Sequence, residues 1–585
     1  MAENNLNMKH LKLEIIQIIS LPVLLLLPVS GNGADLSLLP LTTRQQTIRP
    51  VAIPPGTPQI CPSNVPLYKV YGYSAWQLGP GEDQGRKFDL MPAGYTGATN
   101  TARLLSYFSM SDIHITDKES PAEVIYDGWS APFHAGGLFS QAYSPVCLST
   151  THVLDAAVKT VNALHRQTPF DFGICLGDAA NSSQFNELRW FIDVLDGKHI
   201  TPSSGAHLGA DTIGYQKPYQ AAGLDRSIPW YEVIGNHDQF WMGVGHVTDK
   251  IRKAEVGSGI LNIDTNVLAP NATEGTGMYV GVVDGTTPYG EVIKGGPTNL
   301  FATPPTVVAD KNRHSLTTVA SSSKNYMNEF FNTASFPVGH GFNRTNTGSA
   351  SACYTFEPMK NMPIKIIVLD DTCKSISPSG GPLYYGSGWI DAAPYAWLTN
   401  ELQKGQDAGQ LMIVAAHIPI NPQKDLFDTK SDPQFYPSPD NHNDTNLIAT
   451  LNHYPNLILL MAGHRHLNTV TPQPSPDPAH PEYGFWEVET PSLRDFPRQF
   501  RTFDIRRNSD NTISIVTTDV DPQVEDGSPA AESLGYAIGA YRLFGNTTLA
   551  DTTSHAYNAE LVKPLSPAMQ TKIAAYGAPL GQPVQ

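Results

Sequence analysis

The chain has 585 residues, a hydrophobic fraction of 41% and a formal net charge of −16 at pH 7. This length exceeds what one small core holds, so we expect one large elaborated domain or two to three units. The negative charge argues against a general nucleic-acid binder, which would present a basic face. The 48 glycines and 48 prolines predict many turns and long loops.

The first 34 residues have the three-part pattern of a secretory signal peptide. Two lysines precede an apolar run from Ile15 to Val29, and small residues follow up to Ala34. The run is short for a membrane span and contains two prolines, so we expect cleavage and a secreted or periplasmic protein. The alternative, an uncleaved anchor, stays open, and we expect membrane contact only through this segment.

The five cysteines are an odd number for a secreted chain. Cys175 stands inside an apolar segment and is predicted to be a buried thiol. Cys353 and Cys373 flank a predicted pair of strands and could form a disulfide, and this pairing stays open. Because no Cys-x-x-Cys pair occurs, the sequence contains no cysteine zinc site of the usual spacing.

The composition divides the rest of the chain into three parts. Residues 35–100 are rich in Pro, Gly and Thr, and we expect an extended N-terminal arm rather than a domain. The main domain is expected over residues 101–524, with a turn-rich insertion at about 239–348. A stretch this long between core strands is usually functional or an inserted subdomain. Residues 525–585 are expected to form a C-terminal extension with no assigned role.

Within the main domain, apolar segments that predict strands alternate with amphipathic segments that predict helices. The predicted strands are 104–110, 170–176, 230–234, 352–356, 364–369, 411–416, 457–462, 484–489, 501–505 and 512–518. The predicted helices are 149–167, 186–195, 393–405 and 445–451. This order predicts a layered α/β protein, in which ligands bind at the carboxyl ends of strands.

Side chains that can bind metal ions follow five of these strands. The set contains only Asp, His and Asn, which suits divalent Mn, Fe, Zn or Co and not a structural zinc. Seven ligands are too many for one ion and are the right number for two. A carboxylate can bridge two ions with its two oxygens, and Asp178, in a tight Gly-Asp turn, is the natural bridge. The seven residues are Asp112, His114, Asp178, Asn236, His417, His464 and His466.

Two of the segments contribute a pair of ligands. In extended chain, Asp112 and His114 are two residues apart and would point the same way. His464 and His466 have the same spacing, and each could reach one ion. An isolated Asp-x-His pair is more often a surface Asp next to a core His, so the prediction depends on the other four segments.

These ligands stand in five ordered blocks, each after an apolar segment. The blocks are Asp112-Ile113-His114, Gly177-Asp178, Gly235-Asn236-His237-Asp238, a lone His417, and Gly463-His464-Arg465-His466. In this order they resemble the calcineurin-like metallophosphoesterases, and the resemblance covers roughly residues 101–470. It implies a two-sheet sandwich flanked by helices and a metal-dependent enzyme that hydrolyses small-molecule phosphoesters.

The resemblance also implies a role for each residue. The first metal ion would be held by Asp112, His114 and His466. The second ion would be held by Asn236, His417 and His464. Asp178 would lie between the two ions, and His237 would be the catalytic histidine beside them.

A charge count agrees with this chemistry. Two divalent ions, two carboxylates and a bridging hydroxide leave about one positive charge, because Asn236 is neutral. Such a site attracts phosphate and stabilises the charge of in-line attack by the hydroxide. His237 could protonate the leaving alkoxide or hydrogen-bond a phosphoryl oxygen. Asp238 could orient the His237 ring or cap the following segment.

Departures from known subfamilies narrow the expectation. Purple acid phosphatases carry a tyrosine ligand shortly after the bridging Asp, and none is near Asp178, which disfavours an iron(III)–tyrosinate site. Protein Ser/Thr phosphatases carry an Asp-Arg pair where Asn181-Ser182 stands here, which disfavours a phosphoprotein substrate. A phosphodiesterase or nucleotidase is the alternative to a general phosphomonoesterase. A non-catalytic scaffold would have lost some of these residues, and all are present.

Some residues are weaker candidates for substrate contact. Asn181 could touch the substrate or a metal-bound water, or only cap the following helix. His340 stands between glycines at the end of the insertion and could line the pocket or merely be exposed. Arg189, Arg494 and Arg498 could pair with phosphate, and surface ion pairs are the alternative.

Overall fold

The computed structural model describes residues 42–126, 145–263, 277–317, 324–349, 351–372, 386–420, 444–543 and 557–580. The chain divides into two compact units, Met1–Leu39 and Pro40–Gln585, and every described residue belongs to the second. The predicted signal peptide lies outside the described residues, as does Cys373. Among the helices of the described ranges, none combines the length and the hydropathy that a membrane crossing requires.

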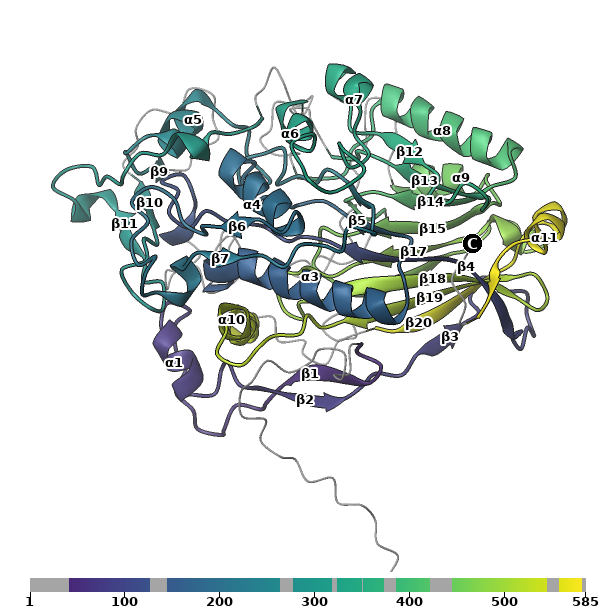
Figure 1. Ribbon diagram of the computed structural model, residues 1–585, viewed down its shortest axis with the longest axis horizontal. Coiled ribbons are helices and arrows are strands. Elements are labelled where there is room, and N and C mark those ends of the chain that lie inside the picture. The colour runs from purple at the N-terminus through teal and green to yellow at the C-terminus, as the bar shows by residue number, and fades with distance from the viewer. Residues whose placement is uncertain are drawn as a thin grey trace, which may run out of the picture. The chain divides into compact units, whose positions relative to one another are not determined.

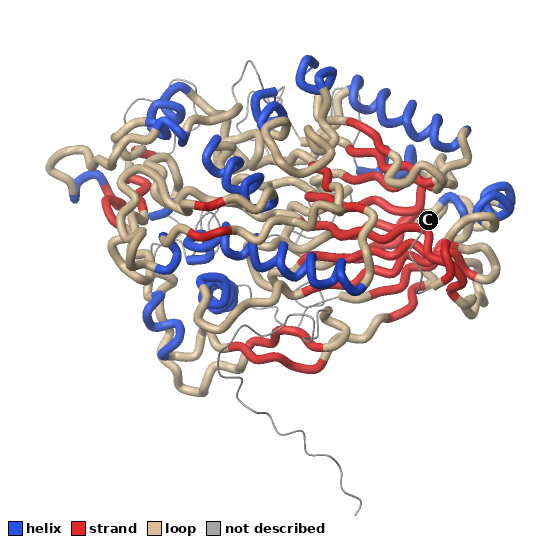
Figure 2. Tube along the Cα trace, viewed as in Figure 1, coloured by secondary structure: helices blue, strands red, loops and turns tan. Residues whose placement is uncertain are grey.

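Two mixed β-sheets form the core (Figures 1 and 2). The larger sheet has eight strands, in the order β3 (Gly85–Lys87), β20 (Ala559–Lys563), β19 (Ile513–Val520), β18 (Phe500–Asn508), β4 (Asn100–Met110), β5 (Phe172–Cys175) and β8 (Trp230–Glu232), with β21 (Ala578–Pro579) paired to β4. The smaller sheet has six, in the order β12 (Tyr354–Phe356), β13 (Ile364–Val368), β14 (Leu411–Ala415), β15 (Leu457–Ala462), β17 (Phe485–Glu489) and β16 (Thr469–Gln473). Strands β4, β5 and β8 run parallel, as do β13, β14, β15 and β17.

Tyr107, on β4, joins the two sheets. Its ring stacks between Phe172 and Phe503 on the neighbouring strands, with centroid distances of 4.6 and 4.9 Å. Its hydroxyl donates a 3.3 Å hydrogen bond to Sδ of Met461, on β15 of the smaller sheet. The faces of the two sheets therefore pack against each other, and side chains alternate between this inner face and the helix-covered outer face.

Helices cover the outer faces of both sheets. Helix α4 (Phe185–Leu195) packs on β4, β5 and β8, and α3 (Thr150–Gln167) contacts both α4 and α10 (Pro529–Leu543). On the smaller sheet, α8 (Ala392–Asp407) and α9 (Asp444–Leu451) bury Leu398, Leu402 and Leu451 against β13, β14 and β15. The protein is therefore an α/β two-sheet sandwich flanked by helices, which confirms the predicted fold class.

The predicted insertion contains short elements with a small core of their own. Its helices are α5 (Asp249–Val256), α6 (Lys324–Glu329) and α7 (Arg344–Ser349), and its three-stranded sheet consists of β9 (Asn262–Ile263), β10 (Met278–Val282) and β11 (Ile293–Pro297). Trp241, Ile251 and Val280 pack together there with Val124. Elements this short carry too few residues for a periodic pattern to be detected in the sequence.

Both ends of the second unit take part in the main body. Near the N-terminus, β1 (Gln46–Pro50) pairs with β2 (Trp76–Pro80), and α1 (Val65–Val70) lies between them in the chain. Strand β20 pairs with both β19 and β3, so the larger sheet extends beyond the predicted boundary at residue 524. The last residue of this strand, Lys563, is buried, and its amino group donates to the main-chain oxygens of Glu482 and Gly484. The remaining described elements are β6 (His199–Ile200), β7 (Tyr219–Gln220), α11 (Pro567–Ile573) and the 3₁₀ helices η3 (Pro145–Ser149), η4 (Gly214–Gln216), η5 (Thr298–Leu300), η6 (Lys311–Arg313) and η7 (Pro481–Tyr483).

Candidate metal centre

The turns that follow β4, β5, β8, β14 and β15 meet at one edge of the sandwich. The main-chain nitrogens of Asp112 and His114 donate to the main-chain oxygens of Gly177 and Asp178, at 3.1 and 2.9 Å. In the smaller sheet, the main-chain nitrogen of Gly463 donates to the main-chain oxygen of His417, two residues after the end of β14, at 2.9 Å. Hydrogen bonds between backbones thus hold together segments that lie far apart in the sequence.

Asp112, His114 and His466 form a first ligand group, with Asp178 beside it. Nε2 of His466 lies 3.3 Å from Oδ1 of Asp112 and 3.2 Å from Nε2 of His114. Nε2 of His114 lies 3.8 Å from Oδ1 of Asp112 and 3.8 Å from Oδ2 of Asp178. These separations suit ligand atoms that each lie about 2.1 Å from a common metal ion.

Asn236, His417 and His464 form a second ligand group, again with Asp178 beside it. Oδ1 of Asn236 lies 2.9 Å from Nε2 of His417 and 3.2 Å from Nδ1 of His464. Nε2 of His417 lies 3.2 Å from Oδ2 of Asp178. The amide nitrogen of Asn236 donates to the main-chain oxygen of Gly243 at 3.1 Å, which turns the amide oxygen toward the histidines. The structure therefore brings all seven predicted ligands together, three on each side of Asp178.

Asp178 faces both groups through one oxygen only. Its Oδ1 accepts a 2.8 Å hydrogen bond from the main-chain nitrogen of His237, whereas Oδ2 faces His114 and His417. In this orientation the two predicted ions would share Oδ2, and Oδ1 would stay with the main-chain nitrogen of His237.

In three of the ligand histidines, Nδ1 points away from the centre, and we call it the outer nitrogen. The hydrogen bond of this outer nitrogen determines whether Nε2, the inner nitrogen, can bind a metal ion. Nδ1 of His417 lies 2.8 Å from a main-chain oxygen, which can only accept, so Nδ1 carries the proton and Nε2 offers a lone pair. Nδ1 of His466 lies 2.6 Å from Oδ2 of Asp495, and Nδ1 of His114 lies 3.2 Å from Oδ1 of Asn181, with the same consequence. In all three rings Nε2 is therefore the atom that can offer a lone pair to a cation.

These lone pairs converge on carboxylate and amide oxygens that also lack hydrogen atoms. Oδ1 of Asp112 is buried and accepts no hydrogen bond from any described residue. Atoms that carry lone pairs repel one another at 3 Å unless a proton or a metal cation lies among them, and burial strengthens the repulsion. The donor atoms of the centre therefore fit metal cations.

The charges of the centre lead to the same conclusion. Burial lowers the pKa of His417 and His466, but the carboxylates of Asp178 and Asp112 overcome it and raise both pKa values to about 10. Burial and the positive side chain of His417 together lower the pKa of His464 to about 3. Without a metal ion, the Nε2 atoms of His417 and His466 therefore each hold a second proton, and a metal cation would replace that proton in each ligand group.

The backbone at the ligands has an unusual conformation. Asp112, His114, Asp178, His464 and His466 all have positive φ, between 48° and 74°. This left-handed region is uncommon for residues other than glycine and costs free energy, and such residues cluster at functional sites. The prediction that Asp112 and His114 point together because the chain is extended is therefore wrong in its reason. The strand ends at Met110, and two left-handed residues aim the side chains.

His237 lies beside both groups, as the resemblance implied. Its ring meets that of His114 edge to face, with a centroid distance of 4.5 Å, and one ring nitrogen lies within 4.8 Å of ligand atoms of His114 and Asp178. Its Nδ1 lies 2.6 Å from the main-chain oxygen of Asn181, so Nδ1 holds a proton and Nε2 is the available atom. Gly243 permits this ring position, because a Cβ there would lie 2.2 Å from the His237 ring.

Asp238 does not orient the ring of His237. Its two oxygens accept hydrogen bonds from the main-chain nitrogens of Asp178, Ala180 and Gly235 and from the hydroxyl of Tyr326, at 2.5 to 3.0 Å. The carboxylate therefore clamps the turns after β5 and β8 to each other. The predicted catalytic role is corrected to a positioning role, since the four donors leave no place for the ring.

Asn181 contacts one of the predicted ligands, His114. Its Oδ1 faces Nδ1 of His114, and its Nδ2 donates to Oε1 of Glu123 at 3.0 Å. The residue that precedes α4 is Gln184, so Asn181 does not cap that helix. The predicted cap is therefore wrong, whereas contact with a substrate or a metal-bound water stays a prediction. Glu123 turns the amide oxygen of Asn181 toward the histidine.

His340 and Arg189 lie away from the centre. His340 is fully buried and stacks on Trp230 at 3.4 Å, while Nδ1 bonds a main-chain oxygen and Nε2 bonds Thr333. It therefore supports β8 and does not line a pocket, and burial lowers its pKa to about 4. Arg189 forms an ion pair with Asp193, four residues along α4, as the alternative to phosphate binding predicted, but the arginine is buried and not on the surface.

Arg494 and Arg498 are buried, which contradicts the surface ion pairs considered for them. The main-chain nitrogen of Arg494 donates to the main-chain oxygen of Asp112 at 3.3 Å, and Nη2 of Arg498 donates to the main-chain oxygen of Arg494 at 2.8 Å. The positive charge of Arg494 contributes to the lowered pKa of His114 and of His237, after the larger effect of burial. Arg494 thus places a positive charge on one side of the centre.

Two contacts of the centre had no signal in the sequence. Asp495, from the loop between β17 and β18, holds Nδ1 of His466. Arg465 forms a two-point pair with Glu489 on β17, with 2.8 Å between Nε and Oε1, and so anchors the turn that carries the last two histidines. Asp495 comes from a distant loop and therefore has no local sequence pattern. Arg465 stands between two predicted ligands, but the sequence does not show that its partner is Glu489.

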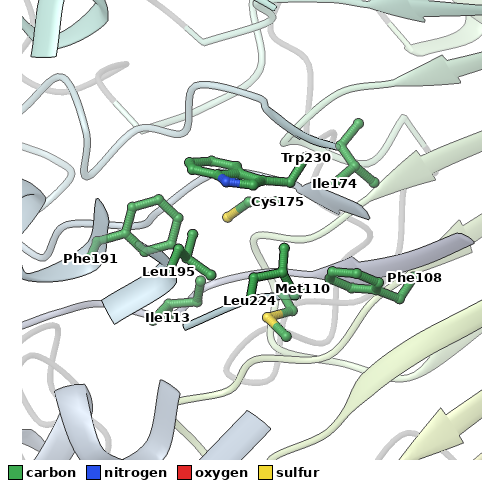
Figure 3. A pocket seen from close by; sticks show the side chains of 9 residues that line it. All are labelled: Phe108, Met110, Ile113, Ile174, Cys175, Phe191, Leu195, Leu224 and Trp230. Carbon is green, nitrogen blue, oxygen red and sulfur yellow. The ribbon is translucent and has the colours of Figure 1, made fainter. Parts of the chain in front are cut away.

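An apolar cavity of about 20 Å³ lies beneath the first ligand turn (Figure 3). The figure shows Ile113, between the two ligands of that turn, together with Phe191 of α4 and Trp230 of β8 around it. Cys175 also lines it and is buried, as predicted, and burial raises the pKa of its thiol. A space of this size and lining has no room for a substrate, so it is a packing gap.

Similarity to known proteins is found among solved structures. No family model matches the chain, and no curated protein matches it. Among solved structures, a dimetal phosphatase from Danio rerio is similar over 72% of this chain and 97% of its own, with 9% sequence identity and a TM-score of 0.35.

Proposed function

We propose that this protein is a metal-dependent hydrolase that cleaves small-molecule phosphoesters. The observation that supports the proposal most is the shared oxygen Oδ2 of Asp178, 3.8 Å from Nε2 of His114 and 3.2 Å from Nε2 of His417. Two divalent ions, of Mn, Fe, Zn or Co, would polarise a phosphoryl oxygen and activate water as the nucleophile. The residues that would hold them are Asp112, His114, Asp178, Asn236, His417, His464 and His466.

The charge balance of the ligands favours an anionic substrate. Asp112 and Asp178 contribute two negative charges, whereas Asn236 contributes none. The centre therefore keeps a net positive charge when two divalent ions are bound, and Arg494 adds to it from one side. Positive potential in a buried site attracts phosphate and stabilises the charge that develops during in-line displacement.

His237 would serve the leaving group or the phosphoryl oxygen. Asn181 holds the Nδ1 proton of His237, so any further proton must be carried by Nε2. From Nε2 the residue could donate to a leaving alkoxide as a general acid, or donate a hydrogen bond to a phosphoryl oxygen. The two roles differ in their dependence on the leaving group, which makes them separable by experiment.

A substrate comparison tests the proposal. We expect protein loaded with Mn²⁺ to hydrolyse p-nitrophenyl phosphate, bis-p-nitrophenyl phosphate or a nucleotide, and His417→Ala to lose that activity. The preferred ester decides between a phosphomonoesterase and the alternatives, a phosphodiesterase or a nucleotidase. Binding of Mn²⁺ without hydrolysis of any of these esters would favour a non-catalytic scaffold and would contradict the proposal.

The place of action is a separate proposal, which rests on residues 1–34 alone. Their signal-peptide pattern supports a secreted or periplasmic enzyme. The mature chain would then begin between Asn32 and Asp35. N-terminal sequencing of exported protein tests this, and an intact Met1 or Met8 would contradict cleavage.

A further inference from the structure

Asp495 reaches the first ligand group from a loop that the ligand blocks do not include. Its Oδ2 lies 2.6 Å from Nδ1 of His466, and 36% of its side chain is exposed. The loop is fastened to the centre, because the hydroxyl of Ser492 donates to the main-chain oxygen of Asp112 at 2.7 Å. The same hydroxyl accepts hydrogen bonds from the main-chain nitrogens of Arg494 and Asp495, at 2.9 and 3.3 Å. The carboxylate is thus held in place by the residues around it.

His466 differs from the other histidines in the partner of its outer nitrogen. The outer nitrogen of His114 bonds the neutral amide of Asn181, and that of His417 bonds a neutral main-chain oxygen. Only His466, among these three, bonds a carboxylate. A carboxylate on the outer nitrogen fixes the tautomer and makes the inner nitrogen more basic, which strengthens a metal–histidine bond.

Negative charge is also distributed unequally between the two ligand groups. The first group contains the carboxylate of Asp112 and receives that of Asp495 through His466. The second group contains the neutral amide of Asn236 in the corresponding place. Asp178 is shared, so it does not distinguish the groups. A divalent cation gains more from carboxylates than from an amide at the same distance.

We propose that Asp495 is a positioning residue that makes the site of Asp112, His114 and His466 the tighter of two metal sites, so that the sites fill in order. This inference rests on the metal centre of the proposed function, but not on the reaction. Asp495 acts through His466 and need not touch the substrate. Arg494 and Arg498 interact electrostatically with Asp495 and hold the carboxylate beside His466, against repulsion by Asp112.

Titration of metal-free protein with Mn²⁺, followed by calorimetry and by the Mn²⁺ paramagnetic resonance signal, tests the inference. The wild type should bind in two steps of different affinity. Asn236→Ala should remove the weak step and keep the tight one, which assigns the steps to the two groups. Asp495→Asn should weaken the tight step by about 10- to 100-fold and leave the weak step nearly unchanged. Asp495→Glu should restore part of the loss.

Matched controls separate this role from a structural one. Asp504 is a partly exposed carboxylate on β18 that bonds Arg506, and Asp504→Asn should leave both steps unchanged. The inference would be overturned if the wild type bound in one step, if Asp495→Asn left the tight step unchanged, or if it weakened both steps equally. Failure of the wild type to bind Mn²⁺ at all would instead overturn the metal centre itself and the proposed function with it.

Discussion

The main-chain oxygen of Asn181 accepts a 2.6 Å hydrogen bond from Nδ1 of His237. The side chain of the same residue holds Nδ1 of His114, so Asn181 fixes the tautomer of one predicted ligand and of the predicted catalytic histidine. The two contacts use different parts of the residue. A substitution of the side chain therefore affects the ligand and leaves the contact to His237 in place.

We predict that Asn181→Ala weakens metal binding at the first ligand group by about 10- to 100-fold, because His114 loses the partner that orients it. Competition with a chelator measures this affinity. Ser182→Ala is the matched control, since Ser182 is also buried and its hydroxyl also contacts Glu123, at 3.4 Å. Equal affinity in wild type and Asn181→Ala would show that Asn181 does not position the ligand.

His237→Ala should distinguish the two roles proposed for this residue. An alkyl phosphate leaves as a strongly basic alkoxide and needs a proton, whereas p-nitrophenolate hardly does. A lost general acid should therefore slow alkyl esters by about 10²- to 10⁴-fold and p-nitrophenyl esters far less. Steady-state rates on both esters, with metal content measured in parallel, check this. Equal slowing with metals retained would assign His237 to the phosphoryl oxygen, and loss of metal would make it a ligand.

Asp238 and Tyr326 should affect folding more than chemistry. Tyr326→Phe removes one of four hydrogen bonds to a buried carboxylate, which should cost about 1 to 3 kcal/mol of unfolding free energy. Asp238→Ala leaves three buried main-chain donors unpaired and should cost more, about 3 kcal/mol or above. Chemical denaturation measures both. A larger loss in Tyr326→Phe than in Asp238→Ala would contradict the clamp.

Much of the centre was predictable because each ligand follows an apolar strand directly. In a parallel arrangement the carboxyl ends of strands lie at one edge, so Asp178 and Asn236, at the ends of neighbouring strands, had to meet. The local path of the chain was not predictable in the same way. Nothing in an Asp-x-His sequence indicates that both residues are left-handed, since tertiary hydrogen bonds to Gly177 and Asp178 impose it.

The roles of the residues around the ligands were harder to predict from the sequence. Asp238 stands in a ligand block, yet its carboxylate serves main-chain donors, and only the fold decides between those donors and the neighbouring ring. Asp495 comes from a loop with no pattern of its own. His340 lies between glycines, which suggested a loop near a ligand, but packing on Trp230 buries it. The roles of Asp238, Asp495 and His340 are all determined by contacts between segments that are distant in the sequence.

Glu487 predicts how stability depends on pH. The pKa of the Glu487 carboxyl is raised from 4.5 to about 7, mainly by burial. The hydrogen bond from Gln473 lowers this pKa, the negative charge of Glu489 raises it, and the positive charge of Arg465 lowers it. The folded protein thus holds this proton more tightly than the unfolded chain. The stabilisation is complete below about pH 4.5 and is lost as pH rises through about 7, by up to about 3 kcal/mol. The carboxyl group of Glu487 also accepts a hydrogen bond from the main-chain nitrogen of Ile420.

Glu487→Gln cannot ionise, so this variant should escape the loss. We expect its melting temperature to match the wild type near pH 5 and to exceed it near pH 8. Glu357 is exposed, and Glu357→Gln is the control, with no change of the difference between the two pH values. A wild type and a Glu487→Gln variant with parallel pH profiles would show that Glu487 is ionised throughout.

The most direct test is the rate of p-nitrophenyl ester hydrolysis as a function of the Mn²⁺ bound per chain. Protein stripped with a chelator is reloaded in steps, and elemental analysis gives the metal content at each step. We predict no hydrolysis without metal, full activity when two ions are bound, and neither two bound ions nor activity in Asp178→Asn, because Oδ2 of Asp178 faces both ligand groups. A wild type that binds two ions and hydrolyses neither the monoester nor the diester, or an Asp178→Asn variant that keeps both metals and full activity, would contradict the account.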